Sequence, residues 1–429
     1  MTTPRAAAVA RRAGWVIADQ ALSSLTNFVL GVLAARVLGP EGFGAFALGS
    51  ITYLFCLNLS RALTTDPFTV RESAAPEEAR RRAVPAATGA AVACGIVGGA
   101  ISAAAGAAIG GPTGLALVAF GVAMPGALLQ DAWRYVFFAA ATPRTAVVND
   151  AAWAVAQLAS MGSLIALGRA DLLSLIAAWG GSAVVAAVLG AAQASALPAP
   201  ARAWSWLRAN GDLGIRYAAD ALAVVGATSV GTYALGAISG LAAVGAIRAA
   251  QLLLGPLNVV YIGGTSIVVP EGARLLTAAR RRLPAALAGY SAALVAAMVV
   301  YSVALGLALR TGDLGAALLG RTAMGAAAVL VPTALLFVAN GATAGGVLGL
   351  RVLAAAADGL RARLIVATMT LAASVAGALV AGAWGFAAGS AAAAAVGAAV
   401  FWAVFARAFR APERSGRAMR HAPPLGVEL

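Results

Sequence analysis

Charged side chains inside otherwise apolar segments are the residues of this chain whose types could do chemistry. Asp19, Arg61, Asp131, Arg134 and Asp150 each interrupt a run of alanine, leucine, valine or glycine in the first half of the sequence. An ionisable group inside a bilayer costs about 2.5 to 3.5 kcal/mol on insertion scales, so it faces a water-filled cavity or an opposite charge. If the apolar segments are membrane spans, these five residues are expected to form one polar network.

The arginines of this network could bind an anion. Asp131 and Arg134 are three residues apart, so they can pair directly on one face of a helix. Arg61 needs a carboxylate from a neighbouring segment. Its candidate partners are Asp19, Asp66 and Asp150. An arginine that is not neutralised is available to an anion, because its planar guanidinium group can donate two parallel hydrogen bonds to a phosphate.

The carboxylates of the same segments allow a second kind of chemistry. A carboxylate that is desolvated between helices can take up a proton or bind a cation, as ion-coupled transport requires. A permanent salt bridge is the alternative at each position, and Arg216, one turn before Asp220, favours the salt bridge there. The candidates for ion coupling or for salt bridges are Asp19, Asp131, Asp150 and Asp220.

The composition indicates that the apolar segments are membrane spans. Hydrophobic residues make up 61% of the 429 residues and charged residues only 11%, unlike a soluble domain. A bilayer core needs about 20 helical residues, and apolar runs of that length recur along the whole chain. We therefore predict an all-α polytopic membrane protein with about twelve transmembrane helices. The predicted spans are about 15–37, 43–63, 84–108, 114–139, 145–167, 172–195, 214–238, 245–269, 285–308, 323–349, 363–381 and 386–406.

The distribution of arginine predicts the orientation. The formal net charge is +14, and the basic residues are arginines, with no lysine. They concentrate in alternate loops and at both termini, whereas the other loops have little more than Arg169, Arg310 and Arg321. By the positive-inside rule both termini are cytoplasmic, and the charge needs no nucleic acid to explain it.

The two halves of the chain repeat each other weakly at an offset of about 200 residues. The triple arginine at 80–82 aligns with that at 280–282, and the order of spans and loops also agrees. We predict an N-lobe at 1–196, a cytoplasmic linker at 197–212, and a C-lobe at 213–429 that ends in a short basic tail. Six spans per lobe make the two lobes parallel, an arrangement typical of alternating-access transporters.

The stretch ARVLGPEGFGAFALG, residues 35–49, separates the first two spans. Gly39 followed by Pro40 is a helix stop, and the glycines at 42 and 44 allow the second helix to begin close by. We predict a tight outer turn between two helices.

This hairpin also carries a family resemblance. The sequence WVIADQALSSLTNFVLGVLAARVLGPEGFGAFALG resembles the first two helices of Wzx-type polysaccharide flippases in the multidrug, oligosaccharidyl-lipid and polysaccharide (MOP) exporter superfamily. The segments LSRALTTDPFTVR, LQDAWRYVFFA and GLRVLAAAADGLRAR extend the resemblance over most of the chain. It implies the MATE-like fold of two six-helix lobes and an alternating-access mechanism.

The resemblance also implies a cargo, a polyprenyl-diphosphate-linked oligosaccharide moved from the cytoplasmic to the outer leaflet of the bacterial plasma membrane. Arg134 and Arg61 are then expected to capture the diphosphate, with Arg36 and Arg248 along the outer part of the path. For Arg61 and Arg36 the alternative is an interfacial anchor. Expected partners are the lipid-linked glycan, membrane lipids, and a polysaccharide polymerase with other assembly proteins, around a monomeric transporter.

Two other kinds of function are alternatives to this expectation. The same fold could export another cargo, such as lipid II or a drug. A membrane polymerase or glycosyltransferase of the same pathway would need a large outer loop with reactive groups, and the longest predicted loop, 309–322, is short and poor in them. The single histidine, His421, lies in the tail, and no Walker A motif is present. We therefore predict no enzyme, no metal site and no cofactor, with coupling to a proton or sodium gradient.

Overall fold

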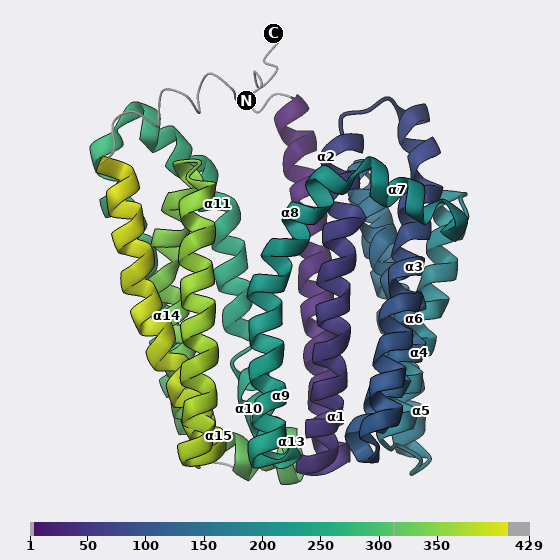
Figure 1. The fold of residues 1–429 in the computed structure, drawn as a ribbon, viewed down its shortest axis with the longest axis vertical. Helices are drawn as coiled ribbons and strands as arrows, with labels where there is room; N and C mark the ends of the chain where they lie inside the picture. The colour runs from purple at the N-terminus through teal and green to yellow at the C-terminus, as the bar shows by residue number, and fades with distance from the viewer. Residues whose placement is uncertain (1–3, 312–313, 411–429) are drawn as a thin grey trace. The chain divides into compact units, whose positions relative to one another are not determined.

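The computed structural model describes residues 4–311 and 314–410, which are helical with short connections and contain no strand (Figure 1). The predicted basic tail and His421 lie outside the described residues. The helices of the first half are α1 (Pro4–Leu63), α2 (Thr65–Glu72), α3 (Glu77–Ile109), α4 (Gly111–Ala139), α5 (Pro143–Ala166), α6 (Leu172–Ala194) and α7 (Ala203–Ala209). Those of the second half are α8 (Gly211–Ala221), α9 (Ala227–Ser239), α10 (Leu241–Leu253), α11 (Pro256–Ala278), α12 (Leu283–Thr311), α13 (Leu314–Leu319), α14 (Ala323–Val352) and α15 (Ala356–Arg410).

The long helices contain the predicted spans. The 60-residue α1 is two spans joined at Gly39, whose φ of 68° breaks the helix at the predicted turn. The 55-residue α15 is likewise two spans, which meet at Gly382 with a φ of 57°. Only glycine adopts such angles without strain. A π-helical turn at Leu222–Gly226 joins α8 to α9 within one span.

Seven helical segments of the described chain are long and apolar enough to cross a membrane. Two of them, Ala18–Glu72 and Ala356–Arg410, each hold two predicted spans. The other predicted spans correspond to α5, to α8 with α9, and to α10 with α11, which are more polar or are interrupted. The helices are therefore compatible with twelve crossings.

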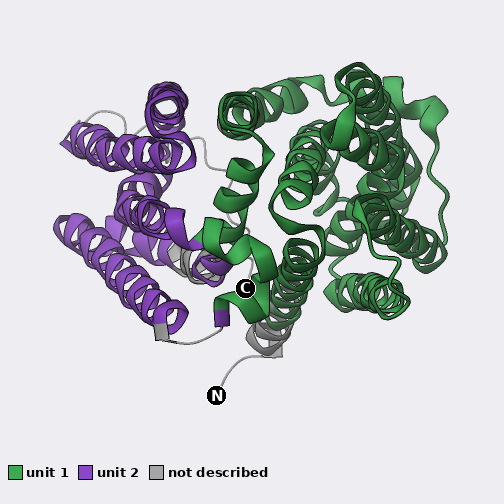
Figure 2. Cartoon of the chain, turned by 90° about the horizontal axis from the view of Figure 1, so that it is seen from below, with its two compact units in different colours: residues 1–252, 315–326 green, residues 253–314, 327–429 purple. Residues whose placement is uncertain are grey.

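The chain divides into two compact units, coloured separately in Figure 2. Unit 1 comprises residues 1–252 and 315–326, and unit 2 comprises residues 253–314 and 327–429. Unit 1 therefore contains α8, α9 and α10 in addition to the first six spans. It also contains η4 (Gly320–Thr322), which is bound to α1: Thr322 Oγ1 donates to the carbonyl of Ala35 at 2.8 Å.

Small residues allow the helices of unit 1 to pack closely. A Cβ atom on Gly99 or Gly121 would meet the backbone of the other, and Gly106 and Gly114 form a second such pair between α3 and α4. Without a hydrophobic force between helices in lipid, such close van der Waals contact is what holds them together.

The linker at 197–212 is packed onto unit 1. Ala199 N–H donates to the carbonyl of Pro85 at 2.8 Å, and Trp206 packs against Phe68 with ring centroids 6.1 Å apart. Arg71 on α2 donates to both carboxylate oxygens of Asp212 at 2.8 Å. These contacts fix the segment that follows the sixth span.

Unit 2 has its own apolar core where α12, α14 and α15 meet. Leu283, Leu287, Phe401 and Phe405 are at most 5% exposed there. Trp402 Nε1 donates to the carbonyl of Ala342 at 2.9 Å, which ties α15 to α14. Unit 2 is thus a helical bundle in its own right.

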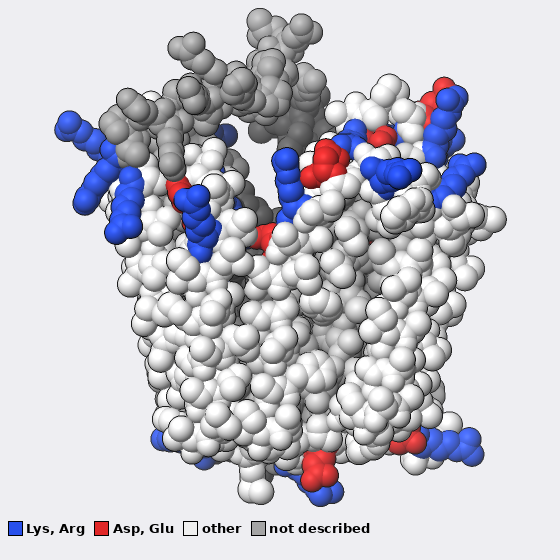
Figure 3. All heavy atoms as spheres, in the orientation of Figure 1, with Lys and Arg blue, Asp and Glu red and all other residues white. Residues whose placement is uncertain are grey.

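The arginines of each unit gather mainly at one end of its helices, as the blue side chains in Figure 3 show. In unit 1 this end carries α2, the start of α3, and α7. The arginines at this end include Arg71, Arg80, Arg81, Arg82, Arg202 and Arg208. The opposite end of unit 1 carries the α5 to α6 loop, where Ser174 N–H donates to Asp171 at 2.7 Å and caps α6. This hydrogen bond lowers the pKa of Asp171.

We predict that a side-chain atom added at the close contact between α1 and α10 destabilises unit 1. A Cβ on Gly44 would strike the backbone of Leu241, and one on Gly245 would strike that of Pro40. Gly44→Ala and Gly245→Ala should each destabilise the protein by about 1–3 kcal/mol, because backbone must move. Thermal unfolding in detergent measures the effect.

Gly181→Ala is the matched control, because Gly181 lies in α6 and a Cβ added to it would meet nothing within 4 Å. It should leave the melting temperature unchanged or raise it, since alanine favours a helix. Equal melting temperatures for all three variants would contradict the prediction.

Candidate functional site

A polar cavity of about 360 Å³ lies inside unit 1, between both halves of α1, α4, α5 and α6. Most of its lining side chains are charged, amide-bearing, hydroxyl-bearing or aromatic. The lining residues are Gln20, Ser23, Thr26, Asn27, Tyr53, Leu54, Leu57, Asn58, Arg61, Gln130, Asp131, Arg134, Tyr135, Phe138, Asp150, Trp153, Ala154, Gln157 and Trp179.

Helical periodicity places these side chains on one face of each helix. On α5, Asp150, Trp153 and Gln157 follow at intervals of three and four residues, and on α4 Gln130, Arg134 and Phe138 follow at intervals of four. Residues at such intervals lie on one stripe of a helix. Each helix therefore presents a polar or aromatic stripe to the cavity.

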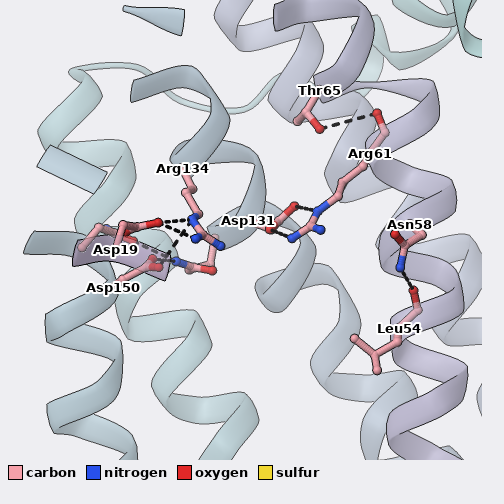
Figure 4. A network of polar contacts seen from close by, with 10 residues as sticks. Asp19, Leu54, Asn58, Arg61, Thr65, Asp131, Arg134 and Asp150 are labelled. Carbon is pink, nitrogen blue, oxygen red and sulfur yellow. Dashed lines mark hydrogen bonds and ion pairs between the residues drawn. The ribbon is translucent and has the colours of Figure 1, made fainter. Parts of the chain in front are cut away.

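Arg61 and Asp131 form one ion pair of the cavity, between α1 and α4 (Figure 4). Nε of Arg61 donates to Oδ2 of Asp131 at 2.8 Å, and Nη2 donates to Oδ1 at 2.6 Å. The guanidinium also lies over the ring of Tyr135, 5.3 Å from its centroid. The arginine side chain is 26% exposed and the aspartate 8%, so the pair is mostly desolvated.

Arg134 is the centre of a second ionic group. Its Nε donates to Oδ2 of Asp19 at 2.6 Å and lies 3.6 Å from Oδ2 of Asp150. The guanidinium also lies 5.7 Å from the ring centroid of Phe138. Figure 4 shows Asp19 and Asp150 approaching Arg134 together. One arginine thus holds two carboxylates, from α1 and α5.

An amide chain orients Asp150. Nε2 of Gln130 donates to Oδ1 of Asp150 at 2.7 Å and lies 3.2 Å from Oδ1 of Asn149. Nδ2 of Asn149 donates in turn to the carbonyl of Ala186 at 2.9 Å and to Gln193 at 3.0 Å. These bonds join α4, α5 and α6 around the ionic group.

The network has one more carboxylate than it has guanidinium groups. Among the described residues, Asp19, Asp131 and Asp150 form ion pairs only with Arg61 and Arg134, and all three carboxylates are at most 8% exposed. Oδ1 of Asp19 has no hydrogen-bond partner among the described residues. A charge without full compensation is costly in a desolvated site, so the network is suited to take up a cation or a proton.

The predicted grouping of the five charged residues is present, but the expected pairing is wrong for both arginines. Among the described residues, Arg61 pairs with none of the three carboxylates that were expected for it. Asp131 and Arg134 do not pair with each other on α4. Asp131 instead pairs with Arg61, and Arg134 with Asp19. The sequence spacing identifies partners on one helix only, whereas carboxylates and arginines of neighbouring helices offer better-aligned contacts here.

The other predicted site residues lie outside the cavity lining. Arg36 on α1 donates from Nη1 to the carbonyl of Ala317 at 2.7 Å. Arg248 on α10 and Asp220 on α8 are both half-buried. Their expected roles along the transport path or in ion coupling stay predictions. Among the residues that the structure describes, no group of acidic, histidine or cysteine side chains could hold a metal ion.

The sequence reasoning missed the aromatic and amide part of the lining. Tyr53, Gln130, Trp153, Gln157 and Trp179 were not among the predicted site residues, although each lines the cavity. The three-and-four spacing that links Trp153 and Gln157 to Asp150 was the available signal. Aromatic residues at helical spacing are also typical of ordinary packing, so spacing alone does not distinguish the two.

The fold is similar to that of solved membrane transporters. The lipid II flippase MurJ in an inward closed conformation matches with a TM-score of 0.70 and 10% identity, over 92% of this chain and 89% of that one. A multidrug resistance MATE transporter of the MOP superfamily, in its inward-facing conformation, matches with a TM-score of 0.66 and 13% identity, over 93% and 96%.

A third similar structure is a MOP superfamily transporter from Pyrococcus furiosus, described by the reverse polarity of its binding pocket. It has a TM-score of 0.57 and 13% identity, over 94% of this chain and 95% of that one. No family model and no curated protein matches the sequence.

The chain therefore shares the all-α fold of these solved transporters. This confirms the predicted all-α fold class. The long apolar helices of the described chain agree with the predicted multi-pass membrane protein.

We predict that the pair of Arg61 and Asp131 is coupled strongly enough to measure. Removing one partner of a buried ion pair costs about 3–5 kcal/mol, and the partial exposure of Arg61 reduces this to roughly 2–3 kcal/mol. Asp131→Asn and Arg61→Met should each show such a loss, and the double variant should lose less than the two together. Unfolding by sodium dodecyl sulfate from detergent micelles measures these free energies.

The surface pair of Arg81 and Glu77, whose side chains are 78% and 68% exposed, is the control. Glu77→Gln should change the free energy of unfolding by less than about 0.5 kcal/mol. Strict additivity of the Arg61 and Asp131 variants would show that the two side chains are not coupled.

Proposed function

We propose that this protein is a flippase that moves a polyprenyl-diphosphate-linked oligosaccharide from the cytoplasmic to the outer leaflet of a bacterial plasma membrane. It would serve cell-surface polysaccharide biosynthesis by alternating access, with both termini in the cytoplasm. The lipid-linked glycan and membrane lipids are its proposed partners, together with a polymerase and other assembly proteins.

One observation carries the proposal: two arginines, aromatic rings and amides line one cavity in unit 1. Guanidinium groups bind diphosphate oxygens in a bidentate manner. Aromatic faces and amides are the groups that contact the faces and hydroxyls of a sugar. The resemblance of the N-terminal hairpin to polysaccharide flippases supports the same cargo.

The carboxylates must release the arginines before the arginines can bind this cargo. Arg61 and Arg134 are occupied by Asp131 and Asp19, and the network already has an excess of carboxylate. An incoming diphosphate would be repelled unless a carboxylate were protonated or paired with a cation. We propose that cargo binding is coupled in this way to a proton or sodium gradient, with Asp150 as the extra carboxylate.

Export of a cationic compound is the second candidate function. The same excess of carboxylate over guanidinium would bind a cation directly, and one of the similar structures is of a multidrug transporter. The aromatic rings of Tyr53, Tyr135 and Trp179 could stack on an organic cation as readily as on a sugar. The two arginines of the cavity weigh against this candidate.

We predict that loss of the protein traps the lipid-linked glycan in the inner leaflet. In depleted cells, polyprenyl-diphosphate oligosaccharide should accumulate, and its sugar should be inaccessible from outside in spheroplasts. Wild-type protein should clear it, and Arg134→Lys should clear it at least tenfold more slowly, because lysine keeps the charge but lacks the planar fork.

Arg169→Ala is the matched control, because Arg169 is exposed in the α5 to α6 loop outside the cavity. It should clear the glycan as the wild type does. Normal lipid pools in depleted cells, with the glycan accessible from outside, would contradict the flippase proposal. Cation export that depends on Asp150 in the same cells would favour the second candidate.

We predict that Asp150→Asn weakens the coupling to the gradient without abolishing transport. The substitution removes the excess negative charge while the amide can still accept the hydrogen bond from Gln130. In proteoliposomes, flipping of a fluorescent lipid-diphosphate sugar should respond to an imposed proton or sodium gradient with the wild type and respond at least threefold less with the variant. An unchanged response would rule out Asp150 as the coupling group.

A further inference from the structure

The cavity continues beyond the ionic network along α5. Trp153 and Gln157 lie one and two turns after Asp150 on the same stripe, and both line the cavity. At a rise of 1.5 Å per residue, they lie about 4.5 Å and about 10.5 Å further along the helix. The diphosphate proposed for Arg134, which lies beside Asp150, would therefore have these two side chains next to it.

Two hydrogen-bond donors in this part of the cavity have no partner. Nε1 of Trp153 and Nε2 of Gln157 are buried and unbonded among the described residues, and Gln157 as a whole is only 2% exposed. A buried donor without an acceptor costs about 1–3 kcal/mol. Rotation about the last torsion of glutamine, which has a broad minimum, can turn Nε2 toward a ligand.

Position separates these donors from others in unit 1. The indole nitrogens of Trp133 and Trp206 also lack a partner in the described part of the chain, but both residues belong to an apolar cluster and neither lines the cavity. Trp153 and Gln157 both line the cavity, so a molecule that occupies it could offer them an acceptor once their side chains turn toward it.

Aromatic rings form a wall beside the two donors. Trp179 lies 6.1 Å from Trp153 and 4.8 Å from Tyr53, measured between ring centroids. Phe120 packs behind Trp179 at 5.1 Å and fixes its orientation. Flat apolar faces with donors at their edge match the faces and the polar rim of a pyranose ring.

We propose that Tyr53, Trp153, Gln157 and Trp179 form a subsite for the first sugar ring of the cargo, the ring that is attached to the diphosphate. This proposal rests on the proposed function, because the diphosphate at Arg61 and Arg134 places the ring. The spacing of about one helical turn between Asp150 and Trp153 is close to the size of one pyranose ring.

The unpaired donors define which sugar the subsite prefers. Indole Nε1 is a donor only, and the amide Nε2 of glutamine is also a donor. Both are best met by an oxygen that accepts without donating, such as the carbonyl of an N-acetyl group or the carboxylate of a uronic acid. The subsite therefore selects a hexose that carries such an oxygen over a plain hexose.

Binding of short soluble analogues to the purified protein tests this subsite. The probes are citronellyl diphosphate alone and citronellyl diphosphate linked to glucose, N-acetylglucosamine or glucuronic acid. Isothermal titration in detergent should show that one of the last two compounds binds roughly tenfold more tightly than the glucose compound. Which one does so identifies the source of the accepting oxygen.

Two conservative variants remove the donors and keep the shape of the cavity. Trp153→Phe and Gln157→Met should each abolish the preference over the glucose compound and leave the affinity for citronellyl diphosphate alone unchanged. Trp133→Phe, which removes an unpaired indole N–H outside the cavity, is the control and should keep the preference. The melting temperature of each variant reports whether it is folded.

The outcomes separate the subsite from the proposed function. If citronellyl diphosphate alone binds and Arg134→Lys weakens it, but the sugars add no affinity or the variants keep the preference, the subsite proposal is wrong and the flippase proposal stands. If no diphosphate compound binds, the proposed function fails and the subsite fails with it.

Discussion

The cost of holding charges away from water determines how the core of unit 1 is built. Asp19, Asp131 and Asp150 are almost fully desolvated, and each depends on a guanidinium group supplied by another helix. Removing either arginine would leave a buried carboxylate uncompensated, which is far more costly than losing a surface pair. The ionic network therefore holds both halves of α1, α4 and α5 in register, and the cavity forms around it.

The stability of unit 1 is not the only property that this network affects. Replacing a buried ion pair by apolar side chains is often neutral or stabilising, so stability alone does not account for five charges in this bundle. A network with one uncompensated carboxylate changes its preferred arrangement when a proton, a cation or an anion arrives. Alternating access needs a ligand whose affinity differs between the two conformational states. A ligand that interacts equally with both states does not shift the equilibrium between them.

Hydropathy and glycine placement were sufficient to predict the helical fold, including the break at Gly39 and the approximate ends of the spans. The gathering of Asp19, Arg61 and Asp150 was predictable as well, because isolated charges in lipid must find one another. The actual pairing of Asp131 was not, since it depends on how α4 is rotated against α1. The aromatic part of the lining was missed for a similar reason: Trp153 and Trp179 fit a packed core and a binding surface equally well by spacing.

The charge balance also constrains which cargo the cavity can hold. An excess carboxylate repels a diphosphate and attracts a cation, whereas Arg61 and Arg134 do the reverse. Protonation of one carboxylate would shift the preference of the network toward an anion, because two guanidinium groups would then face only two negative charges. The unpaired donors of Trp153 and Gln157 act in the same direction in either protonation state, since a donor without an acceptor favours an oxygen-rich ligand over a cation. The neutral part of the lining therefore supports a sugar-bearing anion more directly than the charged part does.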